Sequence, residues 1–167
     1  MAIQRTTLLA TPMLRMAFAA VLGFAIDQLS KFFVLDWLNL ASVHTIHVWP
    51  PYLNLMMAWN TGINFGFLSN YDAHWLLVAF SVLISIGLTA WVSNKRGWLL
   101  PLATGAVVGG ALGNAADRIL YGAVVDFLNM SCCSINNPYS FNIADVLIAC
   151  GMVFIVIGNE SPPSPEK

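Results

Sequence analysis

The sequence predicts an α-helical membrane protein with four transmembrane helices and a small extracytoplasmic β element between the first and the second. Composition is the first reason: the chain of 167 residues is 58% hydrophobic and 9% charged, whereas soluble domains have about 25% charged residues. The second reason is that the apolar residues fall into four stretches long enough to cross a bilayer. We expect one membrane-embedded domain over residues 1–167.

The predicted spans cover residues 13–35, 74–93, 98–116 and 141–158. The first, at about 23 residues, would form a helix of roughly 34 Å, against a hydrocarbon core of about 30 Å. Because it is too long for the apolar region of a signal peptide and contains Asp27 and Lys31, we expect it to be retained. The last residues, 160–167, are rich in Pro and Ser and are expected to form a disordered tail.

The basic residues predict how the chain is oriented. Five of the 7 Lys and Arg residues lie at the N-terminus, between the second and third spans, or at the C-terminus: Arg5, Arg15, Lys95, Arg96 and Lys167. The two longer connections, about residues 37–73 and 117–140, contain only Arg118, which adjoins a predicted helix end. The positive-inside rule therefore places both termini in the cytoplasm and the longer connections outside.

The first outer connection contains a strand pattern. In YLNLMMAWNTG, residues 52–62, apolar side chains recur at every second position and Asn60 begins a turn. This period predicts a strand with one apolar face, and TIHVW, residues 45–49, is a candidate partner. The sheet would rest on the membrane surface, where its Trp and Tyr side chains suit the interface. The alternative is an irregular interfacial loop.

Ionisable side chains gather near the outer ends of the predicted spans. Such residues are costly in lipid and indicate function. Asp27 and Lys31 are four residues apart on one helix face and are expected to form a structural pair, and Asp117 has Arg118 and Asn114 nearby. Three further polar residues belong to the fourth span or to the connection before it: Asp126, Asn142 and Asp145. All these groups lie at one depth, near the outer surface.

Two of these carboxylates, Asp126 and Asp145, have no basic neighbour in the sequence. The connection between them is long enough to bring them together. Two close carboxylates in a poorly hydrated place cannot both ionise easily, so one keeps a proton near neutrality. One group can then take a proton from water while the other polarises a carbonyl and protonates a leaving amine. This is the chemistry of an aspartic protease, and it requires neither a metal nor another cofactor.

Four segments resemble the motifs of lipoprotein signal peptidase, or signal peptidase II: DQLSK, NTGINFGFL, GGALGNAADRILYGAVVDF and FNIADVLI, in this order. The resemblance covers about residues 23–148. It implies an aspartic endopeptidase of the bacterial inner membrane that acts on prolipoproteins. Such an enzyme removes the signal peptide by cutting just before a cysteine that carries a diacylglyceryl group.

By motif, the catalytic pair of this family falls on Asp126 and Asp145. The expected supporting or substrate-binding positions are Asp27, Lys31, Asn60, Gly110, Asn114, Arg118, Asn142 and Ala144. The expected partners are diacylglyceryl-modified prolipoprotein signal peptides and membrane lipid, with no nucleic acid, and we expect a monomer. The sequence departs from the family at Ile63 and Asn64, where small residues are more common, and NMSCCSINNPYS is also less typical.

Other readings remain open. A small proton- or ion-coupled transporter would also use carboxylates in the membrane, although transporters usually place their sites near the midplane between repeats. A scaffold that binds lipoprotein precursors would need a groove but no carboxylate pair.

His44 and His47 lack a further metal ligand in their connection, and Cys132, Cys133 and Cys150 lack a nearby His base. The G-x-x-x-G spacings at Gly105, Gly109 and Gly113 predict close helix packing.

Overall fold

The computed structural model of the chain describes residues 2–62, 73–95, 97–133 and 136–159, without the side chains of residues 2–10 and 73. The helices are α1 (Ala2–Phe32), which continues into the π-helix η1 (Phe33–Trp37), then α2 (Leu40–Val43), α3 (Ala73–Val92), α4 (Leu99–Tyr121) and α5 (Ile143–Asn159). The strands are β1 (Thr45–Trp49), β2 (Leu53–Asn60) and β3 (Val124–Asn129). The predicted tail and the departures at Ile63 and Asn64 lie outside the described residues.

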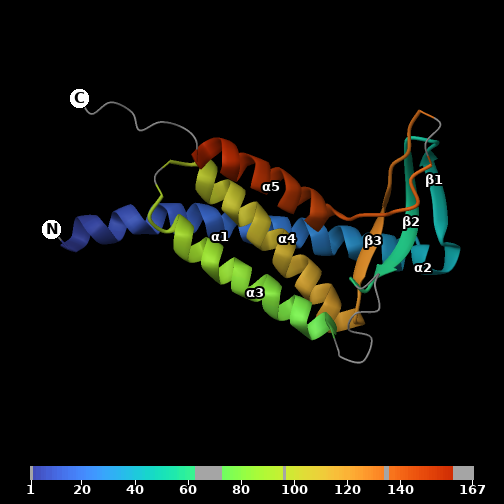
Figure 1. Cartoon of the computed structure of the whole chain (residues 1–167), viewed down its shortest axis with the longest axis horizontal. Coiled ribbons are helices and arrows are strands. Elements are labelled where there is room, and N and C mark those ends of the chain that lie inside the picture. The colour runs from blue at the N-terminus through green and yellow to red at the C-terminus, as the bar shows by residue number, and fades with distance from the viewer. Residues whose placement is uncertain (1, 63–72, 96, 134–135, 160–167) are drawn as a thin grey trace.

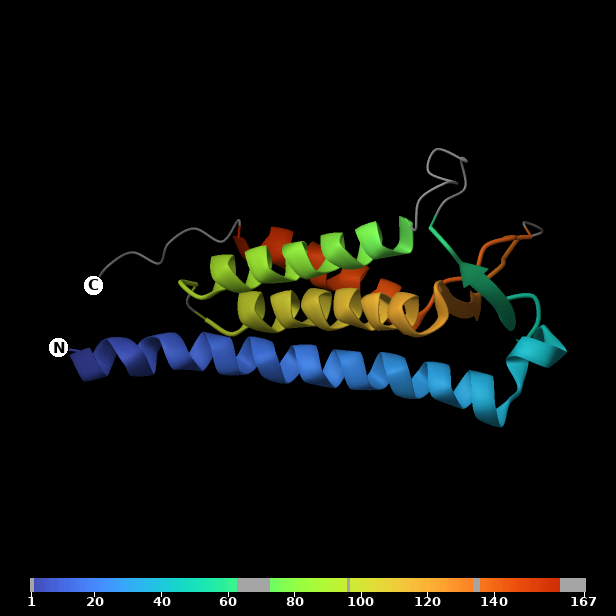
Figure 2. The ribbon, with the colours of Figure 1, turned by 90° about the horizontal axis from the view of Figure 1, so that it is seen from below.

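The four long helices lie side by side, and the sheet lies at one end of them (Figure 1). Helix α4 is central, because it packs against α1, α3 and α5. The start of α1, the end of α3, the start of α4 and the end of α5 gather at the opposite end (Figure 2). The chain therefore has one end built from helix termini and another built from the sheet and α2.

Three of these helices are long and apolar enough to cross a membrane: Thr11–Trp37, His74–Val92 and Leu99–Tyr121. This agrees with a multi-pass membrane protein. The helix α5 is apolar but has 17 residues, fewer than these three segments, so four spans remain a prediction.

The helix α4 ends at Tyr121, beyond residue 116, where the predicted span ended. Asp117 is fully buried within it and ion-paired, so its charge does not end the helix. The end comes at Gly122, whose φ of 74° is left-handed and whose N–H donates to Arg118 O. This is a common way for a helix to end at a glycine.

The sheet has three antiparallel strands in the order β1-β2-β3. The predicted pairing of TIHVW with the following strand is confirmed, since Ile46 lies opposite Leu55. The third strand was not predicted: Asp126 was placed in a connection, whereas it lies in β3 opposite Ala58. The sheet thus brings together residues from the first and the last outer connections.

A small apolar core attaches the sheet to the C-terminal end of α1. Its buried members come from η1, α2 and β3: Val34, Leu40, Val125 and Phe127. From β2, Leu55 and Met57 pack against it, as the alternating pattern predicted. Because Val125 and Phe127 flank Asp126, this core fixes the strand that carries the carboxylate.

The glycines of α4 allow α1 to approach closely. A Cβ at Gly109 would lie 2.5 Å from Ala20 O, and one at Gly113 would lie 2.5 Å from Asp27 Oδ2. Gly105 is in similarly close contact with Met16 O. The close packing predicted from the G-x-x-x-G spacing is therefore confirmed, and it brings the polar residues of α1 and α4 together.

Candidate active site

Asp126 and Asp145 reach the same place from different elements. Asp126 is 2% exposed in β3, and Asp145 is half-buried in the first turn of α5. Both carboxylates bind to a single residue, Asn142. Its side-chain Nδ2 donates to Asp126 Oδ1 at 2.6 Å, and its backbone N donates to Asp145 Oδ2 at 3.1 Å.

Asn142 has this position because it precedes α5 and caps it. Its Oδ1 accepts a hydrogen bond from the backbone N of Asp145 at 3.0 Å, while the Asp145 carboxylate accepts one from the backbone N of Asn142. This reciprocal pair has the geometry of a capping box, with Asn and Asp in place of the usual Ser or Thr and Glu. The sequence N-I-A-D therefore both starts the helix and aligns Asp145.

Two further asparagines donate to the carboxylate oxygens that Asn142 does not contact. Asn60, the last residue of β2, donates from Nδ2 to Asp126 Oδ2 at 2.9 Å. Asn114 of α4 donates from Nδ2 to Asp145 Oδ1 at 3.0 Å. Each carboxylate oxygen thus receives one N–H donor, which fixes both carboxyl planes. The sequence analysis gave Asn60 as a supporting or substrate-binding position, and in the structure it contacts Asp126.

Burial raises the pKa of Asp126 to about 6. The hydrogen bond from Asn60 opposes this change, and repulsion from Asp145 reinforces it. The hydrogen bond from Asn142 and the charge of Lys31 also oppose it. The repulsion from Asp145 and the shared contact with Asn142 place the two carboxylates in one electrostatic site. Asp126 holds a proton there more readily than an isolated aspartate does.

Behind this site lies a buried group of charges centred on Lys31. Lys31 Nζ is 2.7 Å from Asp27 Oδ2 and 2.7 Å from Asp117 Oδ2. It also donates to Asn114 Oδ1 at 3.1 Å. The pairing of Asp27 with Lys31 agrees with the sequence prediction, but Lys31 also pairs with a carboxylate from another helix.

The sequence places Arg118 and Asn114 near Asp117, but the ion pair that Asp117 forms is with Lys31 of α1. Adjacent residues on an α-helix point about 100° apart, so Asp117 faces α1 and Arg118 faces a groove on the other side of α4. The sequence analysis also left Gln28 out of the site. Gln28 Nε2 donates to Asp117 Oδ1 at 3.0 Å and lies 3.2 Å from Asp27 Oδ2. Its place inside DQLSK, between two charged residues, was the available signal.

Gly110 and Ala144 are where α4 and α5 meet, next to the carboxylates. A Cβ at Gly110 would lie 2.6 Å from Ala144 O. Ala144 is fully buried, and its backbone N donates to Asp27 Oδ1 at 2.9 Å. Both residues therefore position the first turn of α5 rather than supply chemical groups.

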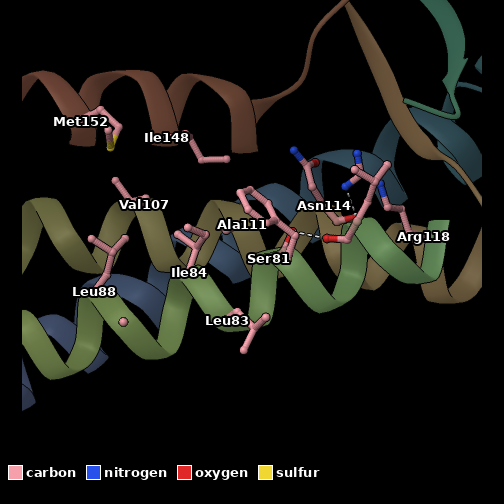
Figure 3. A pocket seen from close by; sticks show the side chains of 13 residues that line it. Ser81, Leu83, Ile84, Leu88, Val107, Ala111, Asn114, Arg118, Ile148 and Met152 are labelled. Carbon is pink, nitrogen blue, oxygen red and sulfur yellow. Dashed lines mark hydrogen bonds between the residues drawn. The ribbon is translucent and has the colours of Figure 1, made fainter. Parts of the chain in front are cut away.

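An apolar groove of about 680 Å³ runs between α3, α4 and α5. Figure 3 shows Ile84, Leu88 and Met152 along it, with Asn114 and Arg118 together at one end. Arg118 Nη1 donates to Asn114 O at 3.2 Å, and Arg118 Nε is buried with no partner among the described residues. Because Asn114 also binds Asp145, the polar end of the groove adjoins the two carboxylates.

The remaining candidates lie apart from this network. His47 Nδ1 contacts Asn54 Oδ1 at 2.8 Å within the sheet. Cys132, Cys133 and Cys150 are exposed and free. A hydrogen bond with Cys133 raises the pKa of the Cys132 thiol. This change lowers the thiolate fraction and so makes Cys132 a poorer nucleophile.

Comparisons with known proteins agree with this arrangement. A family model described as Signal peptidase (SPase) II matches residues 19–159. A lipoprotein signal peptidase of Rhodopseudomonas palustris is 35% identical over 151 residues, 87% of this chain and 92% of that protein. Another, of Caulobacter vibrioides, is 38% identical over 140 residues, 83% of this chain and 82% of that protein.

The fold also has solved relatives. Two chains, each described as a bacterial membrane enzyme structure, superpose with TM-scores of 0.75 and 0.70 at 26% and 25% identity. They cover 89% and 90% of this chain, which in turn covers 94% of each of them. The similarity in fold therefore extends over most of both chains.

Proposed function

This chain belongs to the signal peptidase II family, and we propose that Asp126 and Asp145 are the two carboxylates of its aspartic peptidase site. Membership makes the chain a membrane peptidase that cleaves signal peptides from prolipoproteins. The observation that carries the proposal for the two residues is their common attachment to Asn142, at the polar end of an apolar groove.

The environments of the two carboxylates suggest different roles. Asp145 lies in the first turn of α5, is only half-buried, and accepts hydrogen bonds from the side chain of Asn114 and the backbone N of Asn142. Asp126 is buried, and its pKa, raised to about 6, favours a retained proton. We therefore assign Asp145 as the general base and Asp126 as the general acid.

In the proposed reaction, ionised Asp145 takes a proton from a water held between the two carboxyl groups. The oxygen of that water attacks the scissile carbonyl carbon, while protonated Asp126 donates a hydrogen bond to the carbonyl oxygen. When the tetrahedral intermediate collapses, the C–N bond breaks and Asp126, as the general acid, gives its proton to the leaving nitrogen. The products are a signal peptide with a new carboxylate and a protein with a free amine on its first residue.

The groove accounts for how such a substrate reaches the carboxylates. Its walls are apolar side chains of helices that can cross a membrane, so an apolar signal peptide can occupy it from the lipid side. Asn114 and Arg118 lie at its polar end, and Arg118 Nε has no partner in the part of the chain that the structure describes. We propose that Arg118 binds a carbonyl oxygen of the peptide or of the diacylglyceryl ester, and that the cut falls just before the lipid-modified cysteine.

The arrangement of charges supports an orientation in the bacterial inner membrane. Arg15 and Lys95 lie at the end built from helix termini, where Arg15 Nη1 donates to Gly97 O. The sheet and the start of α5 lie toward the opposite end (Figure 1); Asp126 is in β3 of this sheet and Asp145 is in the first turn of α5. By the positive-inside rule, both termini are cytoplasmic, α5 is a fourth span and the active site is near the outer face. We propose that the chain works as a monomer.

The proposal is tested by incubating purified protein in detergent micelles with a diacylglyceryl-modified precursor peptide and with the unmodified peptide. We expect cleavage of the modified peptide alone, before the modified cysteine, with the site read by mass spectrometry. Asp126→Asn and Asp145→Asn should each reduce kcat by on the order of 10⁴-fold. Asp36→Asn is the matched control, because Asp36 is exposed in η1 and touches none of these groups.

Full cleavage by either active-site variant would show that the assignment is wrong. Equal cleavage of both peptides would show that the lipid is not recognised. If Asp126→Asn or Asp145→Asn lost ion movement in proteoliposomes but kept cleavage, the transporter would instead be favoured.

A further inference from the structure

Four side chains behind the carboxylates form what we call the Lys31 cluster: Asp27, Gln28 and Lys31 of α1, and Asp117 of α4. All of them except the half-buried Gln28 are buried. Each of its two carboxylates is surrounded by donors. Asp117 accepts from Lys31 Nζ, Gln28 Nε2 and the backbone N of Val125. Asp27 accepts from Lys31 Nζ, Gln28 Nε2 and the backbone N of Ala144. An amide of the same size could not replace either carboxylate without losing contacts, because only one of its two terminal atoms accepts hydrogen bonds.

The backbone groups held by this cluster immediately precede the two active-site carboxylates. Asp117 Oδ2 accepts from Val125 N at 3.1 Å, and the next residue is Asp126. Asp27 Oδ1 accepts from Ala144 N at 2.9 Å, and the next residue is Asp145. A single cation, Lys31, lies 2.7 Å from an oxygen of each holding carboxylate. Lys31 and its two carboxylates therefore link β3, which carries Asp126, to α5, which carries Asp145.

Lys31 also reaches the site by a third route. Its Nζ donates to Asn114 Oδ1 at 3.1 Å, and Asn114 Nδ2 donates to Asp145 Oδ1 at 3.0 Å. Asn142 Nδ2 donates to the same Asn114 Oδ1 at 3.1 Å. Since Asn114 Oδ1 already accepts two bonds, the Lys31 cluster fixes which way this amide faces, and so which of its atoms meets Asp145.

We propose that the Lys31 cluster is a positioning device that sets the separation and relative orientation of Asp126 and Asp145 by holding the backbone amide before each of them. The inference rests on the proposed function of those two residues. None of the four side chains touches substrate in this account. Their contribution is to keep two elements, distant in sequence, at the spacing that one shared water requires.

The cluster is also part of the charge around Asp126. The charged groups that act on Asp126 are Asp145 from α5, Lys31 from α1 and Arg118 from α4. Lys31 is in turn ion-paired with Asp27 of α1 and Asp117 of α4. Removing the positive charge of Lys31 makes ionisation of Asp126 harder, and removing the negative charge of Asp117 makes it easier. The two changes therefore move the titration of the site in opposite directions, which simple loosening of the fold would not do.

The test compares three variants, Asp117→Asn, Asp27→Asn and Lys31→Met, with the Asp36→Asn control, using a diacylglyceryl-modified precursor peptide. We expect each cluster variant to lower kcat by about 100-fold and to change KM by less than about 3-fold, because the groove is untouched. The basic limb of the pH profile should move to higher pH in Lys31→Met and to lower pH in Asp117→Asn. Asp117→Asn leaves Asp27 and Lys31 as a balanced pair, so it stays informative if Lys31→Met does not fold.

Two results would overturn the inference. One is a folded Asp117→Asn protein with the kcat of the Asp36→Asn control. The other is a fall in kcat that only follows the fraction of folded protein, with an unchanged pH profile. Asp126→Asn and Asp145→Asn are measured alongside. If they abolish cleavage while the cluster variants do not, only the positioning role fails, whereas cleavage by either of them removes the proposed function itself.

Discussion

Replacing Asn142 separates helix capping from carboxylate alignment. In Asn142→Ala both functions are lost, whereas in Asn142→Ser a hydroxyl oxygen can still accept the N–H of Asp145 and cap α5. Neither variant has the amide that donates to Asp126 Oδ1 at 2.6 Å. The two variants therefore differ in whether α5 is capped, and both lack the hydrogen bond to Asp126.

The expected magnitudes follow from these contacts. Loss of an Asn cap costs about 1 kcal/mol, and loss of a hydrogen bond to a charged, buried group costs about 1.5–3 kcal/mol. Asn142→Ala should thus lower the free energy of unfolding by about 2.5–4 kcal/mol, and Asn142→Ser by about 1 kcal/mol less. If the energy of the missing bond is lost in the transition state, kcat falls by about 10- to 150-fold in both variants.

The assay is kcat on a diacylglyceryl-modified precursor peptide, together with the free energy of unfolding in mixed micelles. Equal loss of kcat in the two variants, with greater stability for Asn142→Ser, would support the bridging role of Asn142. Recovery of full activity in Asn142→Ser would refute it, because capping alone would then account for the residue.

Three further predictions concern the pKa of Asp126 and the packing of α5. Because the folded pKa of Asp126 is raised to about 6 from 3.8, its ionisation costs stability as the pH rises through this range. Asp126→Asn should therefore be more stable than the wild type by up to about 3 kcal/mol above about pH 7, measured by unfolding in micelles, with no gain below about pH 4. An apolar substrate over the site excludes water from Asp126 and so makes its ionisation harder. The basic limb of the pH profile of kcat should therefore lie at higher pH than that of kcat/KM, and coincident limbs would contradict this. Gly110→Ala places a Cβ 2.6 Å from Ala144 O, and a displacement of α5 by close to 1 Å should lower kcat by about 100-fold. In the control Gly23→Ala the new Cβ meets only Leu147 Cδ1, at 3.2 Å, and equal losses in both would contradict the packing argument.

Local patterns in the sequence were sufficient for much of the fold. The apolar run of α3 and the alternation in β2 are visible within a short stretch of the sequence, because both patterns are local. The helix is predicted by a continuous apolar segment, and the strand by one apolar face. The third strand was not predicted, since Val124–Asn129 is buried on both faces and shows no alternation. Its partner β2 is about 65 residues away, and that pairing is not a local property of either segment.

The polar site shows the same limit. Asp27 and Lys31 are four residues apart on one helix, so their pairing could be predicted from spacing alone. The ion pair between Lys31 and Asp117 joins α1 to α4 and depends on the close approach at Gly113. Sequence neighbours suggested Arg118 for Asp117, but the geometry of a helix points these two side chains apart. Long-range contacts of this kind are set by packing.

The coupling between the two carboxylates can be measured most directly by ¹³C NMR titration of the Asp126 carboxyl group in micelles. The account predicts titration near pH 6 in the wild type. It also predicts a shift to lower pH in Asp145→Asn, because a repelling negative charge has been removed. If Asp126 titrates at the same pH in both proteins, the two groups do not influence each other and do not form one catalytic pair.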